Sequence, residues 1–114
     1  MRILVVDDEP AVLETLCYLL VDLGHDAIGV TSGQLALDRF RRASYDLVVV
    51  DLVMPHMNGL EVLRRLRTIS HDTRLVALTG KLPAVGDVLA AAGIPLVSKP
   101  IVTSTDAGAL VEAR

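Results

Sequence analysis

The stretch Leu47-Val48-Val49-Val50-Asp51-Leu52-Val53-Met54-Pro55 decides the fold class of this chain. Its four leading apolar residues are typical of a strand that is buried on both faces, as in the centre of a parallel sheet. Asp51 then stands at the carboxyl end of that strand, which is where open α/β sheets bind their ligands. An alternative is that Asp51 only caps the turn that follows, because Asp is common at such turns.

The composition indicates one globular domain. The chain has 114 residues, of which 52% are hydrophobic, so we expect a single domain over residues 1–114 with a sizeable core. The net charge of −3 and the lack of a basic run give no reason to expect direct binding of nucleic acid. With Cys17 as its one cysteine, the chain has no internal disulfide and no metal–thiolate site. The sequence shows neither a signal peptide nor a membrane-spanning run, which predicts a cytoplasmic protein with no membrane partner.

Apolar runs and amphipathic segments alternate along the chain. Continuous apolar runs predict strands at 3–6, 47–50 and 75–78, and further short strands are expected at 25–30 and 96–98. Helical periodicity and capping residues predict helices from Pro10 to about Leu23, over 33–43, from Gly59 onward, over 85–92, and after a cap at Ser104 or Thr105. Five such units indicate an α/β protein with a doubly wound parallel sheet, because parallel strands need crossover helices.

The first predicted helix is apolar over more than one face. The spacing rule for a buried stripe selects Leu13, Leu16, Leu20 and Leu23. Further apolar residues lie outside this stripe: Val12, Tyr18, Leu19 and Val21. Either the helix is wedged between the sheet and its neighbours, or its outer face docks a partner. In the third predicted helix, Val62, Leu63 and Leu66 point inward, and Arg64, Arg65 and Arg67 point outward.

Polar residues follow the ends of four of the predicted strands. They are Asp7 with Asp8, Asp51, Thr79 with Gly80, and Lys99. Three carboxylates at one sheet edge repel each other unless a cation lies among them, and Mg²⁺ takes oxygen ligands of this kind. The Thr79 hydroxyl and the Lys99 ammonium suit phosphoryl oxygens, and Gly80 leaves room for them. The pattern therefore predicts a carboxylate nucleophile that accepts a phosphoryl group with the help of Mg²⁺.

These residues, in this order, resemble the receiver domain of two-component response regulators. The resemblance covers residues 1 to about 102 and includes the segment from Asp51 to Gly59 and the pair Lys99-Pro100. It implies a flavodoxin-like, CheY-like sheet with strand order 2-1-3-4-5. It also implies that Asp51 accepts a phosphoryl group from a phosphohistidine of a sensor histidine kinase or a phosphotransfer protein. Such a protein is a signalling domain of a phosphorelay and not a turnover enzyme.

The resemblance implies a role for each site residue. Asp8, Asp51 and the backbone carbonyl of Val53 would bind Mg²⁺ directly, and Asp7 would bind it through water. Lys99 would contact the phosphoryl group, and Thr79 would move to hydrogen-bond it. The output would pass to a downstream protein target or to an effector domain outside this chain, and the sequence leaves open whether the chain forms a homodimer.

Three positions depart from the family pattern or tune it. Receivers commonly carry Tyr or Phe three residues before the lysine, where this chain has Leu96, so the usual coupling of threonine to an aromatic ring cannot operate. The positions that tune the lifetime of the phosphoryl group correspond to Val53 and Lys81. Because Val53 cannot orient an attacking water, we expect slow dephosphorylation; the alternative is that Val53 simply packs.

Two other classes of protein are alternatives to a receiver domain. Haloacid-dehalogenase-type phosphotransferases also use a strand-end aspartate, but that aspartate is the first residue of an Asp-x-Asp motif. This chain has Val53 where the motif has its second aspartate. A flavodoxin-like interaction module that is not regulated by phosphorylation is the second alternative. Such a module has no reason to collect Asp7, Asp8, Asp51 and Lys99 at one edge, and Mg²⁺ binding distinguishes the two.

Overall fold

The structure, a computed structural model, describes residues 1–55, 58–80 and 86–113. Its strands form one parallel sheet in the order β2-β1-β3-β4-β5. The strands are β1 (Arg2–Val6), β2 (Asp26–Val30), β3 (Leu47–Asp51), β4 (Arg74–Thr79) and β5 (Leu96–Ser98). The helices are α1 (Pro10–Asp22), α2 (Gly33–Arg42), α3 (Gly59–Ile69), α4 (Gly86–Ala91) and α5 (Ser104–Glu112). The doubly wound fold and the implied strand order are confirmed.

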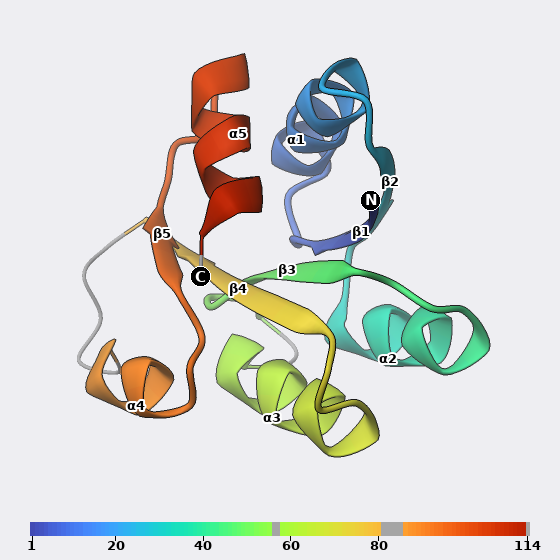
Figure 1. Cartoon of the computed structure of the whole chain (residues 1–114), viewed down its shortest axis with the longest axis vertical. Helices are drawn as coiled ribbons and strands as arrows, with labels where there is room; N and C mark the ends of the chain where they lie inside the picture. The colour runs from blue at the N-terminus through green and yellow to red at the C-terminus, as the bar shows by residue number, and fades with distance from the viewer. Residues whose placement is uncertain (56–57, 81–85, 114) are drawn as a thin grey trace.

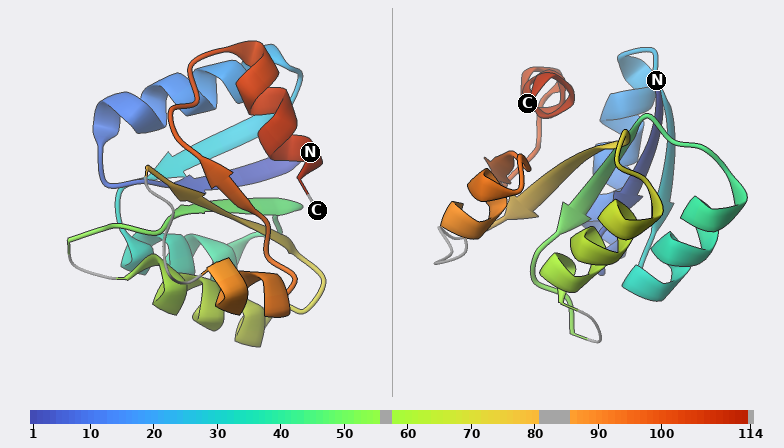
Figure 2. Two further views of the ribbon diagram at one scale, coloured as in Figure 1. Left: turned by 90° about the vertical axis from the view of Figure 1, so that its left-hand side faces the viewer. Right: turned by 60° about the horizontal axis from the view of Figure 1, so that its bottom comes forward.

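The helices cover both faces of the sheet. Figure 1 shows α1 and α5 on one face and α2, α3 and α4 on the other, and Figure 2 shows the same layers from two further sides. Successive residues of a strand enter opposite layers, so Val49 packs with the α1 and α5 side while Val48 and Val50 pack with the other side. All five residues of β3 are buried, which is why this strand reads as an unbroken apolar run.

The helix starts follow local capping chemistry. The Ser32 hydroxyl accepts the N–H of Leu35 at the start of α2, and the Asn58 side chain accepts the N–H of Leu60 at the start of α3. Gly24 follows α1 with a positive φ of 95°, as its position after the last apolar residue predicted. Three of the predicted helix boundaries are therefore set by residues that lie next to the helix end in the sequence.

The start of α5 differs from the prediction of a cap at Ser104 or Thr105. The capping residue is Thr103, whose hydroxyl accepts the N–H of Asp106, while the Asp106 carboxylate accepts the N–H of Thr103. A side chain that accepts a hydrogen bond is needed at the third helical position to close this reciprocal pair. Asp106 supplies it for Thr103, whereas Ala107 and Gly108 stand three residues after Ser104 and Thr105.

The buried side of α1 also differs from the prediction. Leu23 is 40% exposed because the helix ends at Asp22 and the helical spacing no longer applies beyond it. Leu19, which the periodicity left outside the stripe, is buried in the apolar cluster that contains Ala107 and Leu110 of α5. Contact with a second helix widens the buried face of α1. Tyr18 and Val21 stay exposed in the second half of α1, and Val12 near its start is half-buried.

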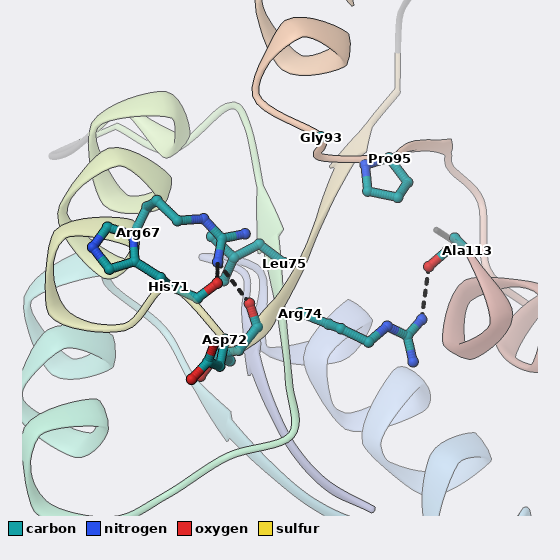
Figure 3. Close-up of a pocket in the computed structure, with 9 residues that line it drawn as sticks. Arg67, His71, Asp72, Arg74, Leu75, Gly93, Pro95 and Ala113 are labelled. Atoms are coloured by element: carbon teal, nitrogen blue, oxygen red, sulfur yellow. Dashed lines mark hydrogen bonds between the residues drawn. The ribbon is translucent and has the colours of Figure 1, made fainter.

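Two arginines hold chain segments at the amino ends of the strands, as Figure 3 shows. Arg67, predicted to point outward, donates from Nη1 to the carbonyls of His71 and Thr73 at 3.0 and 2.9 Å. Arg74 at the start of β4 donates from Nη2 to the carbonyls of Val111 and Ala113 at 2.6 and 2.7 Å. Arg67 is half-buried because its carbonyl partners come from the loop after α3, which helical periodicity does not describe.

The fourth helix is short, as expected from the glycines and proline around it. It has six residues, and the preceding segment 81–85, which contains Lys81 and Pro83, lies outside the described residues. Within the described ranges, none of the helices has the length and apolar character needed to cross a membrane.

We expect Arg74→Met to lower the free energy of unfolding by about 1–3 kcal/mol, because two carbonyls at the end of α5 lose a charged donor. Methionine keeps an apolar stem of similar length. Hydrogen exchange should accelerate in the last turn of α5, while Arg39→Met, at an exposed position of α2, serves as the control. Unchanged exchange in that turn would show that Arg74 does not hold the helix end.

Candidate acidic site at the carboxyl ends of the strands

The central feature of this edge is a cluster of three carboxylates. Val6 of β1 is paired with Val50 of β3, so the residues that follow these two lie side by side. One carboxylate oxygen from each of Asp7, Asp8 and Asp51 lies within 4.8 Å of the others. Asp7 is fully buried, Asp51 is 3% exposed, and Asp8 is half-buried. The structure therefore brings together the three acids that the sequence placed at strand ends.

Lys99 places its ammonium group between two of these acids. Its Nζ lies 2.8 Å from Oδ2 of Asp7 and 3.3 Å from Oδ2 of Asp51. The Lys99 N–H donates to the carbonyl of Thr79 at 2.8 Å, which continues the pairing of β4 with β5 beyond the last strand residue. The side chain is mostly buried, so the two ion pairs are shielded from solvent. Pairing of the two strands thus aims Lys99 at the acids.

Asp51 is held by the loop that follows it. The N–H of Val53 donates to Oδ1 of Asp51 at 3.3 Å, so the alternative that Asp51 caps its own turn is correct as a local description. The capping role does not exclude the site, because Oδ2 is the oxygen that faces Lys99. A Cβ at Gly59 would contact the carbonyl of Asp51 and come within 2.6 Å of Leu52 Cα. Glycine at the start of α3 therefore allows this helix to approach the acid.

Burial and charge shift the titration of the cluster. Burial raises the pKa of Asp51, and the charge of Lys99 and the N–H of Val53 counter this only in part. Burial by itself would lower the pKa of Lys99, but its hydrogen bond to Asp7 and the charges of Asp51 and Asp7 outweigh burial and raise that pKa. One ammonium group faces three carboxylates, so the cluster holds an excess of negative charge.

The remaining predicted residues lie at the same edge with different exposures. Thr79 ends β4 and is 3% exposed, and a Cβ added to Gly80 would meet no atom within 4 Å. The Val53 side chain is 73% exposed, so the alternative that it simply packs is wrong. Lys81, the second position predicted to tune lifetime, lies outside the described residues.

The sequence analysis did not identify an apolar groove beside Lys99. The groove has a volume of about 280 Å³ and runs between α1 and the segment after β5. Its apolar lining residues include Ala11, Val12, Leu16, Pro100, Ile101 and Val102. The lining residues come shortly after Glu9 and Lys99 in the sequence, which was a usable signal for an apolar surface beside the site. The contact between these two distant segments is a tertiary feature.

We expect Asp51→Asn to raise the free energy of unfolding at pH 7 in the absence of divalent metal by on the order of 1 kcal/mol, a common size for a substitution that improves charge balance. Asparagine removes one charge from an over-charged cluster. Because the folded-state pKa of Asp51 is raised, the wild-type folded state binds this proton more tightly than the unfolded state, and wild type loses stability as pH rises through that pKa.

Thermal unfolding of both proteins between pH 4 and pH 8 measures this difference. The advantage of Asp51→Asn should grow with pH and nearly vanish at the acid end. Asp38→Asn is the control, because Asp38 pairs with Arg41 on the surface of α2. An advantage that is independent of pH would contradict a charge-based explanation.

The fold agrees with the comparisons with known proteins. Residues 3–110 match the response regulator receiver domain. The chain is 43% identical to the DNA-binding response regulator MtrA of Mycolicibacterium smegmatis over 88 residues, which are 77% of this chain and 38% of MtrA. It is 37% identical to the transcriptional regulatory protein DltR of Streptococcus agalactiae over 81 residues, which are 71% of this chain and 36% of DltR. The chain belongs to the response regulator receiver family.

Solved structures give the same result. The response regulator TrrA of Thermotoga maritima, in complex with Mg²⁺ and BeF, is 36% identical with a TM-score of 0.80, over 87% of this chain and 86% of TrrA. The chemotaxis response regulator CheY4 of Vibrio cholerae has a TM-score of 0.87 at 23% identity, over 97% of this chain and 95% of CheY4, which supports the fold. TrrA has also been solved in complex with the histidine kinase ThkA.

The acidic cluster fits the cation that receiver domains bind. Three carboxylates supply hard oxygen ligands, which Mg²⁺ prefers over nitrogen or sulfur. Their excess charge over Lys99 is what a divalent cation would neutralise. The donor set of this chain is therefore suited to Mg²⁺.

Proposed function

We propose that the chain is the phospho-accepting receiver of a two-component phosphorelay and that Asp51 is the acceptor. The observation that carries this proposal is the position of the Lys99 ammonium between Asp7 and Asp51, 2.8 and 3.3 Å from their carboxylates. This arrangement puts a buried nucleophile beside a fixed positive charge at a sheet edge. A module without phosphoryl chemistry gains nothing from so much repulsion between carboxylates.

Asp8, Asp51 and the backbone carbonyl of Val53 would hold Mg²⁺ directly, and Asp7 would hold it through water. Bound Mg²⁺ would neutralise the charge that develops on the phosphoryl oxygens. The half-buried Asp8 leaves this side of the cluster accessible, whereas the fully buried Asp7 serves better as an anchor for Lys99.

In the proposed transfer, a carboxylate oxygen of Asp51 attacks the phosphorus of a phosphohistidine. The new oxygen–phosphorus bond forms as the phosphorus–nitrogen bond breaks, and the imidazole leaves with the bonding electron pair and takes a proton from solvent. Lys99 then pairs with a phosphoryl oxygen, and the Thr79 hydroxyl hydrogen-bonds another. The open space beside Gly80 accommodates the group.

The proposed phosphodonor is a sensor histidine kinase or a phosphotransfer protein. The complex of ThkA with TrrA, a relative that is 36% identical to this chain, supports a kinase as partner. The apolar groove between α1 and residues 99–102 lies next to Lys99 and is the docking surface that we assign to the donor. A phosphodonor charged by ATP also favours a cytoplasmic location.

The output would pass to a protein outside this chain. The chain spans 38% of MtrA, which is named a DNA-binding response regulator, and 36% of DltR, which is named a transcriptional regulatory protein. An attached or separate effector is therefore part of the proposal, while the receiver itself acts as a signalling domain with no turnover of an external substrate.

Intact-mass measurement after incubation with phosphoramidate and Mg²⁺ tests the acceptor. We expect wild type and the surface control Asp38→Asn to gain the mass of one phosphoryl group and Asp51→Asn to gain none. Omission of Mg²⁺ should suppress the gain. Modification of Asp51→Asn to the same extent as wild type would assign the wrong acceptor, and no gain in wild type would favour an interaction module that is not regulated by phosphorylation.

We expect Val53→Asn to shorten the lifetime of the phosphoryl group by about tenfold, which is less than the roughly 10²–10⁴-fold that a positioned proton-transfer group contributes in catalysis. The Val53 side chain is 73% exposed at the loop that follows Asp51, so it offers no polar atom to orient an attacking water. The decay of the phosphorylated mass after removal of the donor measures this rate. Val53→Ala is the matched control, and equal decay in all three proteins would contradict the role of this position.

A further inference from the structure

A second cavity lies between α3 and α4, away from the acidic cluster. It has a volume of about 380 Å³, which falls within the range of small-molecule sites. Its apolar lining residues are Leu60, Leu63, Val88, Leu89, Ala92 and Ile94. Leu63, Leu89 and Ile94 are buried and form the floor, whereas Val88 is 62% exposed at the mouth.

The polar part of the lining carries one sign of charge. The remaining lining residues are Arg64, Arg67, Thr68 and His71, so no acid is among the described residues that line this cavity. Arg64 is already neutralised, because it forms two hydrogen bonds with the carboxylate of Glu61. Arg67 differs from Arg64: among the ion pairs of the described residues, none includes Arg67.

Arg67 is fixed in position although its charge is not paired. Its Nη1 donates to three carbonyls of the loop after α3, those of Ser70, His71 and Thr73. Neutral carbonyls orient the guanidinium group without cancelling its charge. Figure 3 shows Arg67 and His71 side by side, where they also line a neighbouring cavity of about 320 Å³. A preorganised cation therefore stands at the end of an apolar cavity.

We propose that this cavity binds a small amphipathic carboxylate. The apolar body would lie between α3 and α4, and the carboxylate would pair with Arg67 and His71. A carboxylate suits the remaining donors of a guanidinium group, and the cavity supplies apolar contact for a chain or ring. The site is separate from the phosphoryl-acceptor site, which lies at the carboxyl ends of the strands.

The location gives such a ligand contact with two elements that leave the acidic edge. The first, α3, begins next to Asp51, because Gly59 approaches the Asp51 carbonyl and donates its N–H to Leu52. The second, α4, comes after β4 and its terminal Thr79. A molecule bound between these helices touches the chain downstream of both β3 and β4.

Titration of the ¹⁵N-labelled chain with sodium octanoate, below its micellar concentration, tests the proposal without any need for phosphorylation. We expect saturable changes in the amide signals of α3 and α4. Octyltrimethylammonium has the same alkyl chain and the opposite charge, and it should bind at least about tenfold more weakly. Ala92→Trp should fill the cavity and weaken octanoate binding at least about tenfold, whereas Ala90→Trp, exposed on α4 and absent from the lining, should bind as wild type.

Thr68→Trp, at the exposed rim of α3, provides a second cavity-filling variant if Ala92→Trp does not fold. Equal affinity for octanoate and octyltrimethylammonium would overturn recognition of an anion. Wild-type affinity in the folded cavity-filling variant would place the site elsewhere, and the absence of saturable binding would overturn the site itself. None of these results depends on Asp51, so they are independent of the outcome for the phosphoryl-acceptor site.

Discussion

The ion cluster of Lys99 with Asp7 and Asp51 is the constraint on which the functional edge depends. Placing two buried carboxylates and a half-buried one beside one ammonium group costs free energy. The sheet offsets this cost because it holds the charged groups in fixed positions, so that they cannot move apart. β1 and β3 pair in register, which fixes the acids, and the backbone bond from Lys99 to Thr79 fixes the lysine. Packing of the apolar strands behind the cluster supplies the free energy that offsets the cost of burying these charged groups.

The loop after β3 shows how one residue serves structure and chemistry together. Asp51 accepts the N–H of Val53 through one oxygen and faces Lys99 through the other. Close approach at Gly59 then brings α3 against the same loop. Local capping and the proposed phosphoryl acceptance therefore do not compete, because a carboxylate has two oxygens with different neighbours.

The opposite ends of the strands are organised by arginines. Arg67 and Arg74 donate to backbone carbonyls where α3 and α5 end, and so satisfy acceptors that these segments leave unpaired. The same use of Arg67 leaves a fixed positive charge beside the cavity between α3 and α4. Leu96 lies half-buried against the core on this side of the sheet, at the position where an aromatic ring is common in the family.

The sequence by itself determined the alternation of strands and helices, the set of strand-end acids and most helix starts. These features depend on residues close in the chain: apolar periodicity, a capping Ser32 or Asn58, and the glycine after α1. Periodicity placed Leu23 wrongly in the buried stripe because α1 ends before it. It also did not predict that Leu19 packs against α5 or that Arg67 binds carbonyls of a loop. Only the tertiary structure decided which oxygen of Asp51 faces Lys99, where Arg74 holds α5, and which cavities lie between helices. Packing between segments distant in the chain sets these features, and such contacts leave no period in the sequence.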